Sequence, residues 1–310
     1  MLHIERVTKN FPDKKALDSL SFSVRQGETF ALLGHSGCGK STILRIIAGL
    51  ETMDSGDVVL GLGSISKLPP HKRGISMMFQ NYALLPHLSV AKNITLDGRY
   101  DRRTLDEILE KMRISELAKR YPSELSGGQR QRVALARALI CNPKVILLDE
   151  PFSNVDPSLK NGLRGELASV VKNFGTTAII VTHDRDDAFC LADRGAIMRD
   201  GRAVQTGSIK ELYSLPTDRY CAEFFGDINE VDQKTAQLLG LDGFAGEPVF
   251  IRPNKITVSD SGIAAVILKS KYFGDFFEYL IGCGGITLKM HTSRHFEIGD
   301  EVRVKVESNF

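Results

Sequence analysis

The stretch GHSGCGKST contains the side chains whose chemical purpose is clearest. It fits the pattern G-x-x-x-x-G-K-[ST], in which backbone N–H groups of a glycine-rich loop and of the following helix point at phosphate oxygens. In that arrangement Lys40 reaches the β- and γ-phosphates of a nucleotide, and the hydroxyl of Ser41 binds Mg²⁺. A glycine-rich turn that matches by chance is the alternative. The predicted phosphate-binding residues are Gly34, His35, Ser36, Gly37, Cys38, Gly39, Lys40, Ser41 and Thr42.

Two neighbouring acids, Asp149 and Glu150, end the apolar run KVILLDE. Neighbouring residues of a strand point to opposite sides, so the two carboxylates can serve different tasks. We expect Asp149 to hold the Mg²⁺ shell and Glu150 to orient and deprotonate an attacking water. A helix-capping or solvated acidic pair is the other interpretation.

Three further side chains are candidates for the nucleotide site only when they are considered together with these motifs. Gln80 follows the run ISMMF and could contact Mg²⁺ and the water, while His183 follows TAIIVT and could hydrogen-bond the γ-phosphate. Phe11 could stack on adenine. Alone, the first two are typical of ordinary strand ends and the third of a core residue. The predicted catalytic residues are Lys40, Gln80, Glu150 and His183, and the predicted metal-binding residues are Ser41, Gln80 and Asp149.

The segment LSGGQRQRVALARAL, residues 125–139, predicts a helix whose start can hold a second anion. Ser126 and Gln129 fit the S-x-x-Q capping box, so a well-capped helix is a sufficient explanation by itself. Glycine in a first helical turn costs up to about 1 kcal/mol relative to alanine. Gly127 and Gly128 therefore favour the close approach of a bulky anion to the backbone. By default, a solvated or salt-bridged face accounts for the arginines that follow, Arg130, Arg132 and Arg137.

These residues need elements that bring them together. Alternating residues at 20–24 predict a half-buried strand, and short apolar runs, typical of buried strands, occur at 27–34, 75–80, 144–151 and 177–183. Helical patterns alternate with them at 41–50, 104–112 and 156–175. Such alternation predicts a mainly parallel sheet that is covered by helices on both faces.

Capping signals fix the ends of two of these helices. A capping box, Thr104 with Glu107, predicts the start of one. For the other, Asp156 is the expected cap and Gly175 the expected stop, with Pro157 in the first turn. Its predicted buried stripe consists of Leu159, Leu163, Leu167, Val170, Val171 and Phe174.

The residue composition and the hydrophobic pattern of the sequence change after Phe225. A glycine-rich and turn-rich stretch leads to short alternating runs such as FEYLI, ITLKM and EVRVKV, which predict a small all-β domain. We therefore expect one domain at 1–230, a linker at 231–246 and a second domain at 247–310.

Composition limits the class of protein. The 310 residues suit two domains, and a net charge of +2 gives no reason to expect nucleic acid as the main partner. The five cysteines are odd in number and lack C-x-x-C spacing, which favours a reducing cytosol over a disulfide or zinc framework. The N-terminal stretch carries charge where a signal peptide has its apolar core. No apolar run approaches the roughly 20 residues that span a bilayer.

In this order the motifs resemble those of the nucleotide-binding subunit of ATP-binding-cassette (ABC) transporters, over roughly residues 1–230. Phe11 falls at the adenine-stacking aromatic position and Gln80 at the Q-loop. His183 corresponds to the switch histidine. The other correspondences are Gly34–Thr42 with Walker A, Leu125–Gln129 with the LSGGQ signature, Val145–Glu150 with Walker B and Ser153–Asp156 with the D-loop.

The resemblance implies a P-loop nucleotide-binding domain with a mainly parallel sheet, an antiparallel β subdomain and a helical signature subdomain. IRPNKI, YFGDFFEYLI and GDEVRVKV resemble the oligonucleotide-binding-like β domain (TOBE) of importer ATPases. In this family two cassettes pair head to tail. Ser126, Gly127, Gly128 and Gln129 of one chain then meet the ATP that Walker A of the other chain holds, which explains the second anion site.

The resemblance further implies ATP and Mg²⁺ as cofactors, a homodimer, membrane permease subunits as partners and an indirect link to a substrate-binding protein. The place of work would be the cytoplasmic face of the membrane. EPFSNVD and CAEFFGDINEV look most like ferric-iron importer ATPases. Polyamine, sugar, thiamine and oxyanion uptake are alternatives. A cytosolic ABC ATPase that acts on nucleic acid or ribosomes is an alternative of another class.

Overall fold

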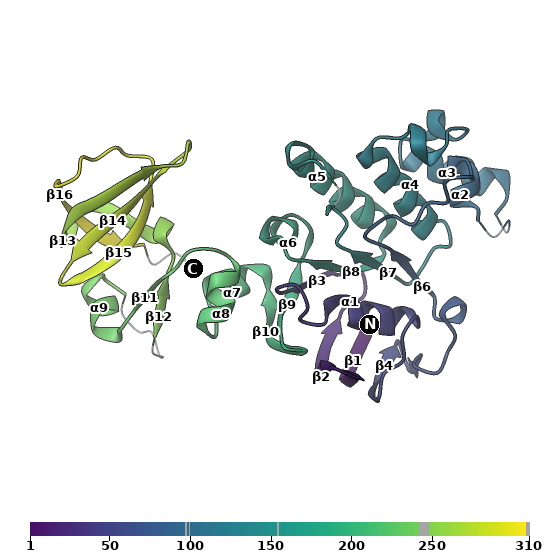
Figure 1. The fold of residues 1–310 in the computed structure, drawn as a ribbon, viewed down its shortest axis with the longest axis horizontal. Coiled ribbons are helices and arrows are strands. Elements are labelled where there is room, and N and C mark those ends of the chain that lie inside the picture. The colour runs from purple at the N-terminus through teal and green to yellow at the C-terminus, as the bar shows by residue number, and fades with distance from the viewer. Residues whose placement is uncertain (97, 99, 154, 242–247, 308–310) are drawn as a thin grey trace. The chain divides into compact units, whose positions relative to one another are not determined.

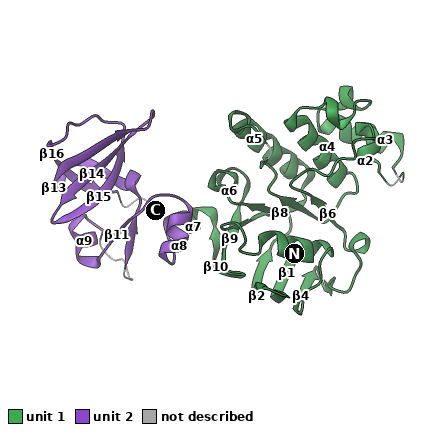
Figure 2. Ribbon diagram, in the orientation of Figure 1, with its two compact units in different colours: residues 1–212 green, residues 213–310 purple. Residues whose placement is uncertain are grey.

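The protein is described here by a computed structural model that covers residues 1–310 except 97, 99, 154, 242–247 and 308–310 (Figure 1). It divides into two compact units, Met1–Leu212 and Tyr213–Phe310, which Figure 2 shows in different colours. Among the described residues, every helix is too short or too polar to cross a lipid bilayer.

The first unit is organised around a six-stranded sheet with the order β10-β9-β3-β8-β7-β6. Neighbouring strands from β9 to β6 run parallel, and β10 pairs antiparallel with β9. The apolar runs at 27–34, 75–80, 144–151 and 177–183 supply four of these strands. The bounds are β3 (Thr29–Leu33), β6 (Ile75–Met78), β7 (Val145–Asp149), β8 (Thr177–Thr182), β9 (Arg194–Arg199) and β10 (Arg202–Ser208).

A second, antiparallel sheet of the same unit has the order β2-β1-β4-β5. Its strands are β1 (Leu2–Phe11), β2 (Lys14–Val24), β4 (Ser55–Leu60) and β5 (Gly63–Ser64). Helix α1 (Lys40–Ala48) contacts β6, β7 and β8 of the first sheet and β2 of the second. Its buried Ile43, Leu44 and Ile47 join the two sheets in one hydrophobic core. The phosphate-binding loop therefore leads into a helix that is packed on two sides.

The other helices of this unit are shorter or more polar. Figure 1 shows α5 and α6 on the side of the six-stranded sheet opposite α1, and α2 and α4 are in contact with each other. The bounds are α2 (Val90–Ile94), α3 (Arg102–Lys111), α4 (Gly127–Leu139), α5 (Pro157–Phe174) and α6 (Arg185–Leu191). Short 3₁₀ turns lie at Pro70–Lys72, Ser115–Leu117 and Pro122–Glu124. Parallel sheet, antiparallel subdomain and helical part match the predicted fold class.

The predicted Thr104–Glu107 capping box is wrong. Helix α3 begins at Arg102, and the carboxylate of Asp101 accepts the N–H of Thr104 at 2.8 Å. Asp101 is thus the cap and Thr104 lies inside the first turn. As a cap acceptor, the charged carboxylate of Asp101 is stronger than the neutral hydroxyl of Thr104, and Glu107 pairs with Arg103 instead.

Helix α5 has the predicted ends but only part of the predicted buried stripe. Asp156 accepts the N–H of Ser158, and Gly175 ends the helix at φ 61°. Leu167 and Val171 are buried, whereas Leu159 is 58% exposed. The buried face instead continues through Arg164, which is 4% exposed and lies three and seven residues before those two. Its ion pair with Asp187 of α6 lets this charged side chain lie on the buried face of the helix.

The second unit contains an antiparallel sheet of order β15-β14-β13-β16 and a two-stranded sheet β11-β12. The strand bounds are β11 (Asn229–Val231), β12 (Val249–Ile251), β13 (Ile256–Tyr272), β14 (Phe277–Cys283), β15 (Ile286–Thr292) and β16 (Glu301–Val306). The helices are α7 (Ile209–Ser214), which crosses the unit boundary, α8 (Arg219–Phe224) and α9 (Gln233–Leu238), with a 3₁₀ turn at Pro253–Lys255. This is the all-β domain that the alternating runs predicted, with short helices added.

The expected linker at 231–246 differs from the structure. Its described part contains α9, and Ala236, Leu239 and Leu241 belong to the core of the second unit. Residues 242–246 of that expectation lie outside the described residues. The unit also begins before residue 230, because the buried Arg252 donates to the carbonyls of Ala222, Gly226 and Tyr213.

Candidate functional site

The predicted catalytic residues lie at one edge of the six-stranded sheet. Gly34 follows β3, Gln80 follows β6, Glu150 follows β7 and His183 follows β8. These four strands are neighbours and parallel, so their carboxyl ends meet at the same edge, where ligands of open α/β sheets bind. Strand register therefore brings together residues that are far apart in the sequence.

Glycines let the phosphate-binding loop lie against other backbone. Gly34 has φ 150°, and a Cβ there would sit 2.5 Å from the carbonyl oxygen of Met198. Gly39 has φ 106°, and a Cβ there would sit 2.5 Å from the carbonyl oxygen of Ala16. Any larger residue would push the loop away from its support. The loop shape thus depends on the glycines that the sequence pattern requires.

Lys40 lies under this loop and is only 5% exposed. Its ammonium donates to the carbonyl oxygens of Gly34 at 2.6 Å and His35 at 3.0 Å. Carbonyl groups leave its positive charge uncancelled, so the ammonium can bind an anion placed over the loop. The exposed residues above it, His35, Ser36 and Gly37, leave that place open to solvent. The loop therefore fits a nucleotide phosphate chain.

A pair of oxygen ligands lies beside Lys40. The hydroxyl of Ser41 donates to a carboxylate oxygen of Asp149 at 3.1 Å. Burial raises the pKa of Asp149, and the charge of Glu150 adds to this, while Ser41 and Lys40 oppose it. A hydroxyl next to a carboxylate that burial has deprived of water is a suitable donor set for Mg²⁺, which prefers oxygen. These two residues of the predicted metal set fit the ion.

Glu150 lies between Gln80 and His183. Its carboxylate accepts from Gln80 Nε2 at 3.2 Å, and its other oxygen lies 3.3 Å from His183 Nδ1. Its backbone has φ 44°, an unusual value outside glycine that costs roughly 1–2 kcal/mol. Its N–H donates to the Val181 carbonyl at 2.9 Å, and its carbonyl accepts from Ser153 N–H at 3.1 Å. This strained turn directs the carboxylate to the edge where a water would be activated.

The loop after Gln80 is held by a residue whose role the sequence did not indicate. Tyr82 and Ala83 both have positive φ, at 61° and 45°. The guanidinium of Arg137, on α4, donates to their carbonyls at 2.6 and 2.7 Å. The predicted solvated face therefore applies to Arg132, which pairs with Glu166, but not to Arg137. Helical periodicity cannot distinguish an arginine that faces solvent from one that faces a neighbouring loop.

The same helix reaches the residue that follows Glu150. Gln131 Nε2 and the hydroxyl of Tyr82 each donate to the carbonyl of Pro151 at 3.3 Å. Both donors are buried, and the side-chain amide oxygen of Gln131, Oε1, has no hydrogen-bond partner. Helix α4 thus touches both segments that carry Gln80 and Glu150. No sequence motif marked Gln131 or Tyr82.

The start of α4 forms the predicted capping box. Ser126 Oγ accepts the N–H of Gln129 at 3.3 Å, and Gln129 Oε1 accepts the N–H of Ser126 at 2.9 Å. A Cβ on Gly128 would lie 3.2 Å from the side chain of Leu163 on α5. Close packing of two helices is therefore a further reason for this glycine, beside anion access. The structure leaves the second anion site a prediction.

Phe11 ends β1 with its side chain 41% exposed. The ammonium of Lys9 lies 5.1 Å from its ring centroid. The next strand begins at Lys14, whose ammonium donates to the carbonyl of Gly37 in the phosphate-binding loop. The turn between β1 and β2 is thereby tied to the loop. The ring is exposed and not a core residue, and its stacking on a base stays a prediction.

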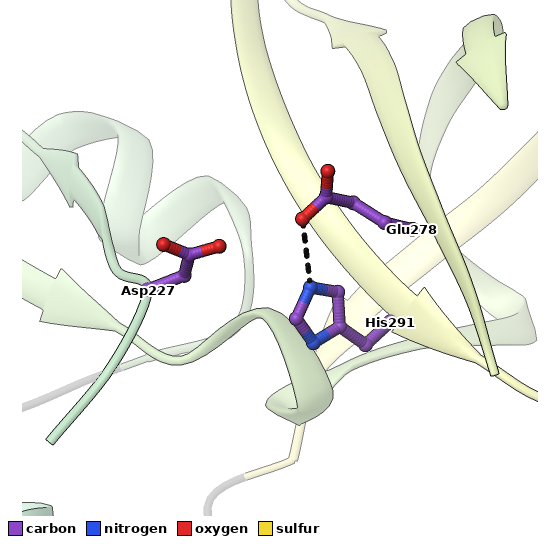
Figure 3. A group of neighbouring side chains, drawn as sticks. All are labelled: Asp227, Glu278 and His291. Atoms are coloured by element: carbon purple, nitrogen blue, oxygen red, sulfur yellow. Dashed lines mark hydrogen bonds and ion pairs between the residues drawn. The ribbon is translucent and has the colours of Figure 1, made fainter. Parts of the chain in front are cut away.

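A second polar cluster lies in the other unit (Figure 3). Asp227, Glu278 and His291 place their ligand atoms within 4.8 Å of one another. His291 is hydrogen-bonded to Glu278 at 3.2 Å, and Lys289 pairs with Asp227 at 3.2 Å. This hydrogen bond and this ion pair explain the cluster without a bound metal ion.

Comparison with known proteins agrees with this geometry. A family model described as "ABC transporter" matches residues 17–153, and one described as "TOBE domain" matches residues 249–309. The spermidine/putrescine import ATP-binding protein PotA of Oleidesulfovibrio alaskensis is 37% identical over 98% of this chain and 74% of its own length. The putrescine transport ATP-binding protein PotG of Escherichia coli is 44% identical over 74% of this chain, which spans 63% of that relative.

A third relative is the Fe(3+) ions import ATP-binding protein FbpC of Rhizobium etli, 37% identical over 89% of this chain and 86% of its own length. Among solved structures, a nucleotide-free ATP-binding cassette of an ABC transporter is 28% identical, with a TM-score of 0.65 over 73% of this chain and 99% of that one. A dimeric bacterial ABC transporter cassette is 30% identical, with a TM-score of 0.60 over 67% and 99%.

Fold and site together define a P-loop nucleotide-binding domain of the ATP-binding-cassette type. The chain belongs to the ATP-binding proteins of ABC transporters and carries a TOBE domain. The predicted family and the predicted fold class are confirmed.

Proposed function

We propose that this protein is the ATP-hydrolysing motor subunit of a bacterial ABC importer. The observation that carries the proposal is the position of Glu150, hydrogen-bonded to Gln80 and adjacent to His183, at the sheet edge that also holds Ser41 and Asp149. A carboxylate held in this way can take a proton from a water molecule that attacks a γ-phosphate.

Each residue of the edge has a defined task in this proposal. Lys40 binds the β- and γ-phosphates, and Ser41 with Asp149 holds Mg²⁺, which supplies charge neutralisation between the phosphates. Gln80 orients the attacking water and contacts the metal shell. His183 donates a hydrogen bond to the γ-phosphate as negative charge develops there. Phe11 stacks on the adenine.

The active form in this proposal is a homodimer in which two ATP molecules lie between the two copies. Ser126, Gly127, Gly128 and Gln129 of each copy meet the nucleotide held by the other. A solved cassette that resembles this chain is dimeric, which supports the pairing of two copies. Membrane permease subunits would convert the closing and opening of the dimer into transport, with a substrate-binding protein as an indirect partner. The protein would then work at the cytoplasmic face of the membrane.

The cargo we propose is a polyamine, with ferric iron as the second candidate. PotA and PotG, two of the relatives described above, carry names of putrescine and spermidine transport. The sequence pattern EPFSNVD favoured iron, and FbpC, which is similar over 89% of the chain, bears an iron name. Asn154, within this pattern, lies outside the described residues.

The release of phosphate from ATP tests the motor assignment. We expect the wild-type chain to hydrolyse ATP in the presence of Mg²⁺. If the isolated chain is slow, the assay is repeated with the permease added. Glu150→Gln should retain ATP binding and lose at least about 100-fold in kcat, as expected for removal of a general base. Lys40→Ala should instead weaken ATP binding. Hydrolysis by Glu150→Gln at the wild-type rate would refute the role of Glu150.

Uptake by source cells that lack this protein tests the cargo. We expect radiolabelled putrescine or spermidine uptake to fall in these cells and to return with the wild-type gene but not with the Glu150→Gln gene. Ferric-iron uptake is measured in parallel. A loss of iron uptake with normal polyamine uptake would support the second candidate and refute the first.

A further inference from the structure

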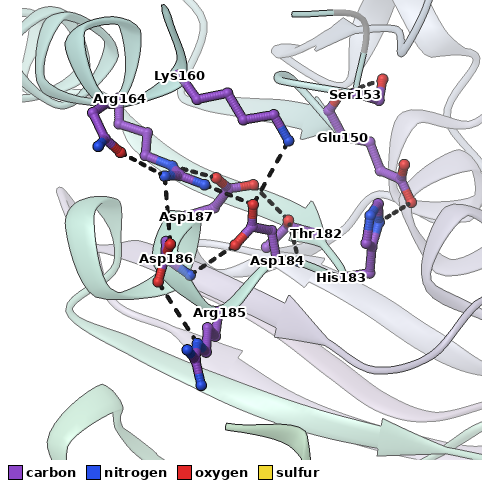
Figure 4. A network of polar contacts seen from close by, with 11 residues as sticks. Glu150, Ser153, Lys160, Arg164, Thr182, His183, Asp184, Arg185, Asp186 and Asp187 are labelled. Carbon is purple, nitrogen blue, oxygen red and sulfur yellow. Dashed lines mark hydrogen bonds and ion pairs between the residues drawn. The ribbon is translucent and has the colours of Figure 1, made fainter. Parts of the chain in front are cut away.

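Helix α5 carries a buried arginine that belongs to none of the motifs. Arg164 is 4% exposed. Its Nε donates to Asp187 at 2.7 Å, its Nη2 to Asp184 at 2.6 Å and its Nη1 to Asn161 at 2.9 Å (Figure 4). A planar guanidinium can bind two carboxylates in this fixed geometry, whereas an ammonium cannot. Arg164 therefore joins α5 to the segment that begins α6.

The two acids that it binds both follow His183 in the sequence, and both are hydrogen-bonded to Thr182, the residue before it. The hydroxyl of Thr182 donates to Asp187 at 2.6 Å and accepts the N–H of Asp184 at 2.9 Å. Asp184 also caps α6 by accepting the N–H of Asp186. The residues immediately before and after His183 are thus fixed to the same buried carboxylate and guanidinium.

The imidazole of His183 itself is held by fewer contacts than its neighbours in the chain. The side chain of His183 is 56% exposed, and its contact with Glu150 is long, at 3.3 Å. An exposed ring with one long contact takes its position mainly from its backbone. The positions of Thr182 and Asp184 fix the backbone at His183. Arg164 holds Asp184 directly and holds Thr182 through Asp187.

We propose that Arg164 is a positioning residue for His183 and acts through Asp184 and Asp187. This inference rests on the proposed function. Helix α5 begins at Pro157, directly after the D-loop that ends at Asp156. Arg164 therefore connects this helix to the backbone on both sides of His183.

A double-mutant cycle on kcat tests this link. We expect Arg164→Met to lower kcat about 10- to 100-fold with the KM for ATP nearly unchanged, as for a misplaced catalytic group. In a His183→Ala chain the same substitution should have little further effect, because it acts through the removed ring. Arg164→Lys should recover only part of the activity. Lys160→Met is the matched control, since this cation of α5 lies 3.7 Å from Asp184 and should leave kcat nearly unchanged.

A second variant covers the case in which Arg164→Met fails to fold. Thr182→Val keeps every charge paired and removes the hydroxyl that joins Asp187 to the Asp184 N–H. Hydrogen exchange of that amide in the nucleotide-free chain should then be at least about tenfold faster, since its acceptor is lost. The kcat should fall in Thr182→Val. In a chain that already carries His183→Ala, Thr182→Val should lower kcat little further.

These outcomes separate the inference from the proposed function. Equal losses of kcat from Arg164→Met, or from Thr182→Val, with and without His183 would overturn the positioning role, although ATP hydrolysis itself would stand. A wild-type chain that releases no phosphate, even with its permease, would refute the proposed function. In that case unchanged amide exchange in Thr182→Val would overturn the structural link as well, and faster exchange would support it.

Discussion

Replacing Arg137 by methionine should loosen the loop that carries Gln80. The guanidinium makes two hydrogen bonds, at 2.6 and 2.7 Å, to carbonyls whose residues have left-handed backbones. Hydrogen bonds to a charged group contribute about 1.5–3 kcal/mol each, so the gross loss is about 3–6 kcal/mol. Tyr82 and Ala83 can then relax from conformations that cost roughly 1–2 kcal/mol each, which offsets part of it. We expect a net loss of about 2 kcal/mol in the free energy of unfolding.

The assay is urea unfolding followed by far-UV circular dichroism, because the chain has no tryptophan. The matched control is Arg132→Met on the same helix, which breaks an ion pair whose side chains are 31% and 46% exposed. Such a pair is worth at most about 1 kcal/mol. A released loop also moves Gln80 away from Glu150, so kcat should fall in Arg137→Met and not in Arg132→Met. Equal stabilities of the two variants would refute the assigned role of Arg137.

Two further predictions concern the anion and metal sites. Ser126→Arg should leave ATP binding to the Walker A loop intact and block hydrolysis, because it obstructs the site in the partner copy; a loss of nucleotide binding by equilibrium dialysis would contradict this. Asp149→Asn should abolish Mg²⁺-dependent ATP binding yet raise the melting temperature of the nucleotide-free chain at neutral pH. Burial raises the pKa of the Asp149 carboxyl above its ordinary value of 3.8, so the folded chain loses stability as pH rises from 3.8 to the raised value. The difference between the two melting temperatures should disappear below pH 3.8, and a lower melting temperature for Asp149→Asn at pH 7 would count against this explanation.

Sequence patterns were sufficient for the elements that carry the site. The runs before Gly34, Gln80, Glu150 and His183 are continuous and apolar, as strands buried on both faces must be, so their carboxyl ends could be expected at one edge. The capping box at Ser126 and the two ends of α5 followed from single residues with strong local preferences. These predictions depend on short-range physics, which the sequence records directly.

The tertiary roles of charged residues were less accessible. Arg137 and Arg164 have the helical spacing of ordinary surface residues, and only the loop or helix opposite shows that they face inward. The same is true of Leu159, whose apolar character predicted burial on α5 although the structure exposes it. A buried guanidinium needs carbonyl or carboxylate partners from distant segments, and spacing along one helix contains no information about them.

The domain boundary failed for a related reason. Glycine and turn residues after Phe225 suggested a loose connection, yet Ala236 and Leu239 pack in the core of the second unit. A few apolar residues in this polar stretch are enough to pack helix α9 into the core, and the composition of the stretch did not predict that helix. Arg252 then binds carbonyls on both sides of α8, so the unit begins earlier than predicted.

The size of the Glu150→Gln protein in the presence of ATP and Mg²⁺ tests the central claim most directly. Two copies that close over two nucleotides should remain closed when hydrolysis is blocked. We therefore predict that light scattering after gel filtration gives twice the mass of one chain with ATP, and one chain with ADP or when Ser126→Arg is added. A Glu150→Gln protein that binds ATP and remains monomeric would contradict the composite site.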